Sequence, residues 1–202
     1  MADLFGSDVG EKIPAPGASL TIFRSVVLPT ASSTLLAKLI GETPWRQETI
    51  TVWGKQHLQP RLVAWYGDPD KAYSYSGVRL KPLPWTDLIM SLRETVERLS
   101  SQSFNSVLLN YYRDGNDSMG FHSDDEPELG ERPVIASLSV GANRTLVFKS
   151  KGPEKTNDIR VQLHDSSLLI MSGDTQKNWK HGIGKVASAL GPRVNLTFRT
   201  IH

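Results

Sequence analysis

The sequence predicts a mainly β fold with flanking helices, and three features support this prediction. Two segments in the first half of the chain show the 3.6-residue apolar period of a helix. From about residue 104 onward, short strand-like segments follow one another without helices between them, which is typical of a sandwich or jelly roll. With 202 residues and 39% hydrophobic content, the chain is long enough for one well-buried domain, and we do not expect two.

The first half of the chain is predicted to hold an arm, a strand and two helices. Residues 1–17 are rich in Gly, Pro and Ala, so we expect a flexible arm followed by a single domain over residues 18–202. A strand is expected near residues 20–27. Ser32 or Ser33 can cap the first helix, and Thr86 or Asp87 can cap the second.

Six strands are predicted in the second half of the chain. They cover residues 107–112, 134–140, 145–149, 159–163, 167–171 and 193–201. In the last of them Arg193, Asn195, Thr197 and Arg199 alternate with apolar residues, so one face of this strand is polar. Two guanidinium groups on one inner face require an anion, and a small dicarboxylic acid fits the planar fork of arginine.

Three residues have the composition of an iron site. His122 and Asp124 stand two positions apart, so on an extended segment both side chains leave the same face. The distant His181 would complete a 2-His-1-carboxylate face, which leaves coordination positions of Fe(II) open for a co-substrate and O2. An isolated His-x-Asp pattern is a weak signal. His164 is an alternative third ligand.

Composition limits the classes of function. The chain has no cysteine, which excludes disulfides and thiolate metal sites. No apolar run approaches the length of a membrane span, and the N-terminus lacks the features of a secretion signal, so we expect an intracellular protein that does not enter membranes. A net charge of +2 permits nucleic-acid binding without requiring it.

Longer motifs surround these residues and give them context. The segment NYYRDGNDSMGFHSDDE begins at Asn110, and PRVNLTFR ends at Arg199. With His181, these motifs resemble the AlkB family of Fe(II)- and 2-oxoglutarate-dependent nucleic-acid dealkylases, over about residues 52–201. The resemblance implies a double-stranded β-helix core, and it is greatest to the branch that repairs duplex DNA.

The resemblance assigns roles to the residues of both motifs. It implies that His122, Asp124 and His181 bind Fe(II) and form the catalytic centre, and that Arg193 pairs with the distal carboxylate of 2-oxoglutarate. Four further residues would complete the co-substrate pocket: Asn110, Tyr112, Asn195 and Arg199. The implied reaction is oxidative demethylation of 1-methyladenine and 3-methylcytosine with release of formaldehyde.

Residues 49–80 resemble the part of the family that recognises the nucleotide. Trp53 occupies the position of an aromatic wedge that enters the base stack, although the family usually has phenylalanine there. Arg61, with Lys55 and His57, could meet phosphates. The loop that contains Tyr75 and Ser76 resembles the one whose aromatic residue stacks on the flipped base. Tyr66 and Glu126 would line the pocket, and Glu126, with Asp125, could recognise the positive charge of the lesion.

Several alternatives remain open from the sequence. One alternative is a 2-oxoglutarate oxygenase that acts on protein or small molecules, which would keep the triad and Arg193. Another is a zinc hydrolase or a metal-free binding barrel, which is a different class of protein. Trp53 could be a core residue. The basic residues that grip the second strand of a duplex are only partly matched by Lys149, Lys151 and Lys155. We expect a monomer that acts on single- or double-stranded DNA, with RNA also open, in the cytoplasm of a bacterium or the nucleus of a eukaryote.

Overall fold

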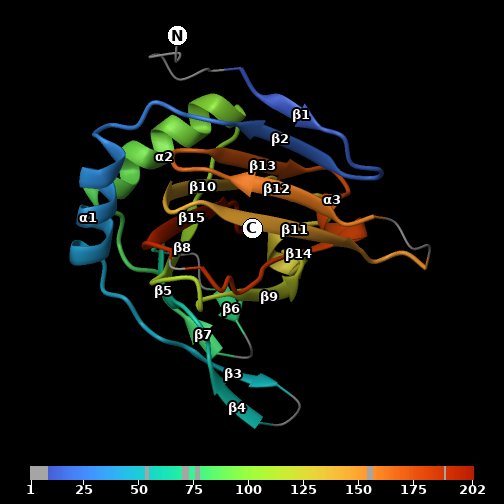
Figure 1. Cartoon of the computed structure of the whole chain (residues 1–202). Coiled ribbons are helices and arrows are strands. Elements are labelled where there is room, and N and C mark those ends of the chain that lie inside the picture. The colour runs from blue at the N-terminus through green and yellow to red at the C-terminus, as the bar shows by residue number, and fades with distance from the viewer. Residues whose placement is uncertain (1–8, 53–54, 70–72, 76–77, 154–156, 189) are drawn as a thin grey trace.

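The structure is a computed structural model, and it consists of two antiparallel sheets that face one another (Figure 1). It describes residues 9–52, 55–69, 73–75, 78–153, 157–188 and 190–202. Trp53 and Ser76 therefore lie outside the described residues, and of Tyr75 only the backbone is described. The prediction of a mainly β fold with flanking helices is confirmed.

The larger sheet has seven strands in the order β1-β2-β13-β10-β15-β8-β5. In this spatial order the strands are β1 (Glu11–Ile13), β2 (Ser19–Phe23), β13 (Leu168–Ser172), β10 (Ile135–Gly141), β15 (Arg193–Arg199), β8 (Ser106–Tyr112) and β5 (Leu62–Gly67). Residues 11–13 belong to the arm predicted over residues 1–17, but they pair with β2, so this part of the predicted arm is a strand of the larger sheet.

The smaller sheet has four strands in the order β12-β11-β14-β9. They are β12 (Ile159–Leu163), β11 (Arg144–Ser150), β14 (Trp179–Ile183) and β9 (Met119–His122). Figure 1 shows β11 and β14 in front of β10 and β15 of the larger sheet. The two short strands β9 and β14 were not predicted, and they pair so that His122 lies opposite His181.

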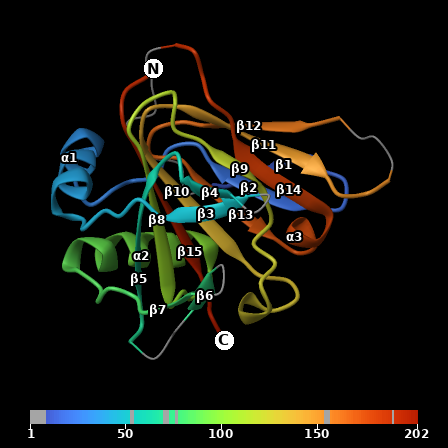
Figure 2. The ribbon, with the colours of Figure 1, turned by 90° about the horizontal axis from the view of Figure 1, so that it is seen from below.

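The helices cover the far face of the larger sheet. Helix α1 (Ser32–Glu42) and helix α2 (Asp87–Ser100) both pack on β10, on the side away from β11 and β14 (Figure 2). Thr86 caps α2 as predicted, since its hydroxyl accepts a hydrogen bond from the Ile89 amide. The predicted cap of α1 is wrong, because Ser32 is already helical and its hydroxyl donates to Asp165. Two short turns complete the helical structure: η1 (Pro127–Leu129) and α3 (Thr175–Asn178).

Strand β15 separates the two layers of the core. Its apolar residues Val194, Leu196 and Phe198 are buried against the helices, so the alternate residues point between the two sheets. The facing side chains of the two sheets include Leu146 and Phe148 of β11. The polar face of β15 is thus enclosed at the centre of the molecule, where a charged side chain requires a partner.

Residues 49–80 include two hairpins that lie outside both main sheets. The first pairs β3 (Thr49–Val52) with β4 (Lys55–Leu58), and the second pairs β6 (Tyr73–Tyr75) with β7 (Val78–Leu80). Both lie at the end of the fold near β9 and β5 (Figure 1). None of the helices in the described part of the chain is both long and apolar enough to cross a membrane.

Candidate active site

His122, Asp124 and His181 come together between the two sheets. One potential ligand atom of each residue lies within 4.8 Å of those of the other two. The Asp124 carboxylate is 4.0 Å from His122 Nε2 through Oδ1 and 3.8 Å from His181 Nε2 through Oδ2. The pairing of β9 with β14 creates this arrangement, because it places both histidines side by side. Exposed His164 is not part of this group, so His181 is the third residue, as predicted.

Contacts behind the triad hold its members in place. His122 Nδ1 lies 3.0 Å from the Gly120 carbonyl oxygen, a distance at which the ring can donate from Nδ1 and keep the Nε2 lone pair for a metal. The Asp124 amide donates to Gln176 Oε1 over 3.0 Å. Ser123 donates to the carbonyl of Trp179, which ties the segment before Asp124 to the strand of His181.

The electrostatics keep the carboxylate of Asp124 ionised. Burial alone would raise the pKa of Asp124, but the positive charge of Arg199 and the nearby His181 and His122 outweigh it and lower the pKa to about 2. Arg199 donates to Asp124 Oδ1 over 2.7 Å. Burial lowers the pKa of His181 to about 4, an effect that His122 reinforces. At neutral pH both residues therefore have the protonation state that a metal ligand requires.

Arg193 is a buried cation beside this site. Its side chain is 1% exposed, and burial lowers its pKa to about 10, so it stays charged at neutral pH. Its Nη2 donates to Ser139, whereas Nε and Nη1 have no hydrogen-bond partner among the described residues. The guanidinium lies 5.1 Å from the ring of Tyr112, and Arg144 lies 5.3 Å from the same ring. A buried guanidinium with two unpaired donors has the chemistry of a carboxylate site.

A small cavity joins Arg193 to the metal triad. Its lining includes seven residues of the predicted co-substrate and metal sites: Tyr112, His122, Asp124, His181, Arg193, Asn195 and Arg199. Asn110 lies nearby on the same strand face as Tyr112, and its Nδ2 also lacks a partner within the described structure. Within this cavity Arg199 donates a hydrogen bond to Asp124, so it contacts the metal site as well.

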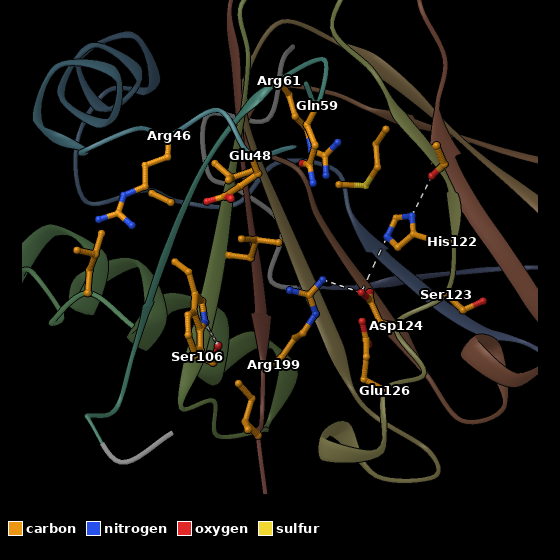
Figure 3. A pocket seen from close by; sticks show the side chains of 18 of the residues that line it. Arg46, Glu48, Gln59, Arg61, Ser106, His122, Ser123, Asp124, Glu126 and Arg199 are labelled. Atoms are coloured by element: carbon orange, nitrogen blue, oxygen red, sulfur yellow. Dashed lines mark hydrogen bonds and ion pairs between the residues drawn. The ribbon is translucent and has the colours of Figure 1, made fainter. Parts of the chain in front are cut away.

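A larger pocket of about 340 Å³ opens on the other side of His122 and Asp124 (Figure 3). Glu126 lines it, and its Oε2 atom is buried without a hydrogen-bond partner among the described residues. Sequence reasoning missed five charged or aromatic residues of this lining: Arg46, Glu48, Trp65, Lys81 and Phe121. The pocket thus combines apolar walls with a few polar groups, as binding pockets do.

Three predicted substrate residues need correction. Tyr66 is 4% exposed and packs in the core near the helices, because on β5 it faces away from its neighbour Trp65, which lines the pocket instead. Arg61 is buried and donates to Asn110 Oδ1 over 2.7 Å, so it lies in the wall of the larger pocket and not at the surface where phosphates were expected. The carboxylate of Asp125 pairs with Lys151 at 2.8 Å and is exposed, and Asp125 is not in the lining of the larger pocket.

The donor set fits one class of metal protein. Two imidazoles and one carboxylate on one side of an ion, with cavities on the other, suit non-haem Fe(II), and the charged and unpaired Arg193 suits a dicarboxylate beside it. The structure thus has the features of a mononuclear iron oxygenase with an anionic co-substrate. Structural and catalytic zinc sites have no need of the second feature.

Comparison with known proteins agrees with this class. The family model described as the 2OG-Fe(II) oxygenase superfamily matches residues 19–199. "Alpha-ketoglutarate-dependent dioxygenase alkB homolog 3" of Mus musculus is 42% identical over 83% of this chain and 61% of its own length. "DNA oxidative demethylase ALKBH2" of Arabidopsis thaliana is 36% identical over 92% of this chain and 67% of its own length.

The chain belongs to the 2OG-Fe(II) oxygenase superfamily and, within it, to the AlkB family. Fe(II) and 2-oxoglutarate are therefore its cofactor and co-substrate. The chain spans about three fifths of the length of the animal alkB homolog 3 relatives. The solved structure of OsALKBH1 has the same fold, with a TM-score of 0.65 over 94% of this chain and 100% of that chain at 16% identity.

Proposed function

We propose that this protein demethylates N-alkylated nucleic-acid bases, with 1-methyladenine and 3-methylcytosine as its lesions. The observation that carries the proposal is the position of the triad between two different cavities. One cavity contains the buried cation Arg193, and the other is large, partly apolar and contains the unpaired carboxylate oxygen of Glu126. The names of two relatives support the same reaction: one is an alkB homolog 3 dioxygenase and the other is a DNA oxidative demethylase.

Each residue of the site has a defined task in this proposal. His122, Asp124 and His181 would hold Fe(II). Arg193 would bind the distal carboxylate of 2-oxoglutarate through Nε and Nη1, and Asn110, Tyr112 and Asn195 would complete the co-substrate cavity. Fe(II) with 2-oxoglutarate and O2 supplies oxidation of a methyl group on a base nitrogen, which ends in formaldehyde, succinate and carbon dioxide.

The larger pocket would select the base. Methylation at the pairing edge gives both lesions a positive charge, and a buried carboxylate without a partner gains most from a cation. Glu126 is half-buried, and its buried Oε2 lines the pocket without a hydrogen-bond partner among the described residues. The other carboxylate of the lining with an unpaired oxygen, Asp124, is already bound to Arg199 and belongs to the metal site. We expect Glu126 to contact the polar edge of the methylated base while the pocket walls exclude water.

Residues 49–80 would open the nucleic acid. The β3–β4 hairpin contributes no strand to either main sheet, which suits an element that approaches a substrate. In this proposal Trp53 fills the gap that an extruded base leaves, and Tyr75 with Ser76 contacts the extruded base. Alkylated DNA is the proposed partner, RNA is the second candidate substrate, and the protein would act as a monomer.

Formaldehyde release decides the proposal. The protein with Fe(II), ascorbate and 2-oxoglutarate is given methylated single-stranded DNA, the matching duplex and the matching RNA, with the unmethylated oligonucleotides as controls. We expect formaldehyde and succinate in equal amounts with at least one methylated substrate. Succinate release that no oligonucleotide stimulates, without formaldehyde, would contradict the proposal and favour an oxygenase of proteins or small molecules.

A further inference from the structure

The outer face of the four-stranded sheet carries basic side chains and one exposed aromatic ring. Lys149 of β11, Arg160 of β12 and Lys180 of β14 are exposed. Lys149 and Lys180 are paired across the sheet, and Arg160 lies opposite Val147, two residues from Lys149. Their buried neighbours Phe148, Val161 and His181 point inward, so all three cations lie on the outer face. Figure 1 shows this sheet in front of the larger one.

The charge of this face is strongly one-sided. None of the four strands contains Asp or Glu. Lys149, Arg160 and Lys180 have no carboxylate partner in the described part of the chain, whereas nearby Lys151 is paired with Asp125. Exposed Asp158 lies just before β12, one residue from its first residue Ile159. Unpaired cations close together attract a polyanion.

Phe121 links this face to the larger pocket. It is 45% exposed, it stands on the edge strand β9 next to His122, and it lines the rim of the pocket. The Lys149 ammonium lies 4.6 Å from the centre of its ring. Strand β14 lies between β11, which carries Lys149, and β9, which carries Phe121. At Gly182 of β14 a Cβ would stand 3.0 Å from the Met119 carbonyl oxygen of β9. The absence of a side chain lets β9 approach β14 closely and lets Lys149 reach the ring.

We propose that this outer face binds the single-stranded segment that flanks the target nucleotide, with an unpaired base stacked on Phe121 and phosphates on Lys149, Lys180 and Arg160. The inference rests on the proposed function, in which the target base occupies the larger pocket, and Phe121 of β9 belongs both to the lining of that pocket and to this face. An exposed ring beside a row of cations is the arrangement by which proteins follow single strands without reading sequence. Paired bases cannot stack on Phe121, so the face favours unpaired substrate.

Binding of an unmodified strand tests the face separately from catalysis. Fluorescence anisotropy measures the affinity of the full chain for labelled oligothymidine of about 12 nucleotides at several salt concentrations. Removing one cation that meets a phosphate of a single strand lowers the salt slope by about 0.7. We expect this decrease in Lys180→Ala and in Arg160→Ala, and no decrease in Lys38→Ala, a matched control on helix α1 across the molecule. Asp158→Asn should strengthen binding.

The aromatic residue is tested by comparing strand types. Phe121→Ala should weaken binding of the single strand roughly tenfold and binding of a duplex less than twofold, and Phe121→Trp should retain the affinity. Salt slopes equal to that of the Lys38 variant, or equal losses on single strand and duplex in Phe121→Ala, would overturn the inference. Because the oligonucleotide carries no lesion, loss of the proposed demethylase activity would leave this result interpretable.

Discussion

Arg199 holds the metal-site carboxylate: its Nη2 atom donates to Asp124 Oδ1 over 2.7 Å. Asp124 is 3% exposed, so this bond neutralises a charge that would otherwise be buried alone. The other oxygen, Oδ2, has no hydrogen-bond partner among the described residues and lies 3.8 Å from His181 Nε2. One oxygen is thus fixed by the guanidinium, and the other is left for a metal.

Arg199→Ala should lower turnover about 10- to 100-fold with little change in the KM for 2-oxoglutarate. The reason is that residues which orient a metal ligand typically contribute this much to affinity or activity. Steady-state formaldehyde release gives kcat and KM, and Mn²⁺ titration measures the metal site directly. A KM increase as large as that of an Arg193 variant would mean that Arg199 binds the co-substrate directly, as the sequence predicted.

Arg193→Ala should raise the requirement for 2-oxoglutarate at least tenfold. Removing one partner of a buried charge-assisted pair costs about 2 to 5 kcal/mol, because the remaining charge stays buried without a partner. The measurement is the KM for 2-oxoglutarate at saturating nucleic acid. Arg132→Ala removes an exposed arginine that pairs with Asp174, and it serves as the control. Unchanged dependence on 2-oxoglutarate in the Arg193 variant would refute the assigned role.

His122→Ala, Asp124→Ala and His181→Ala should each abolish turnover, because two remaining ligands cannot hold Fe(II) in the required geometry. Titration with Mn²⁺ or Co²⁺ should show that metal binding is abolished, with the fold retained by circular dichroism. His164→Ala is the matched control, since His164 is exposed and stands outside the group. Activity abolished without His164 and retained without His181 would mean that the third ligand has been misassigned.

The sequence predicted the strands whose residues alternate and missed those that carry the ligands. The alternation of β15 predicted both its apolar face and the polar face of Arg193, because each face is uniform. Strand β14 has the sequence WKHGI, with only two apolar residues and a glycine, so no period is visible. Its place beside β9 depends on long-range pairing, which no local pattern records.

Dependence on long-range pairing also explains why the predicted lining of the larger pocket was partly wrong. The face of β5 that points to the pocket depends on its register with β8, where Trp65 pairs with Leu108 and Tyr66 with Val107. A shift by one residue exchanges the two faces, and motif comparison alone placed Tyr66 on the wrong one. The burial of Arg61 likewise follows from its contact with Asn110, which lies 49 residues later in the chain.

Gln176→Met should destabilise the protein by about 1 to 3 kcal/mol, because it leaves the buried Asp124 amide without an acceptor at nearly constant side-chain volume. For a domain of this size, that corresponds to a decrease in Tm of roughly 2 to 12 °C. Thermal unfolding with and without Mn²⁺ measures it, and Lys177→Met on the exposed side of the same turn is the control. A Tm equal to that of the control would mean that this hydrogen bond does not hold Asp124.

Trp53 and Tyr75 should affect different substrates, if residues 49–80 recognise the nucleotide. In sequence Trp53 stands between strands β3 and β4 of the first hairpin, and Tyr75 ends β6. A wedge is needed only where a stack must be opened, so Trp53→Ala should depress repair of methylated duplex DNA and largely spare the single strand. Tyr75→Ala should weaken both, because an extruded base loses a stacking partner worth roughly 1 to 3 kcal/mol wherever it came from.

The comparison requires the same lesion in a single strand and in its duplex, with formaldehyde release measured for both variants and for Trp53→Phe. Phenylalanine keeps an aromatic wedge, so Trp53→Phe should retain duplex repair. Phe121→Ala adds an internal contrast, because the loss expected from the outer face of the four-stranded sheet falls on the single strand. Equal losses for Trp53→Ala on both substrates, together with a lower Tm, would identify Trp53 as a packing residue, since loss of a core side chain destabilises the protein whatever substrate is bound.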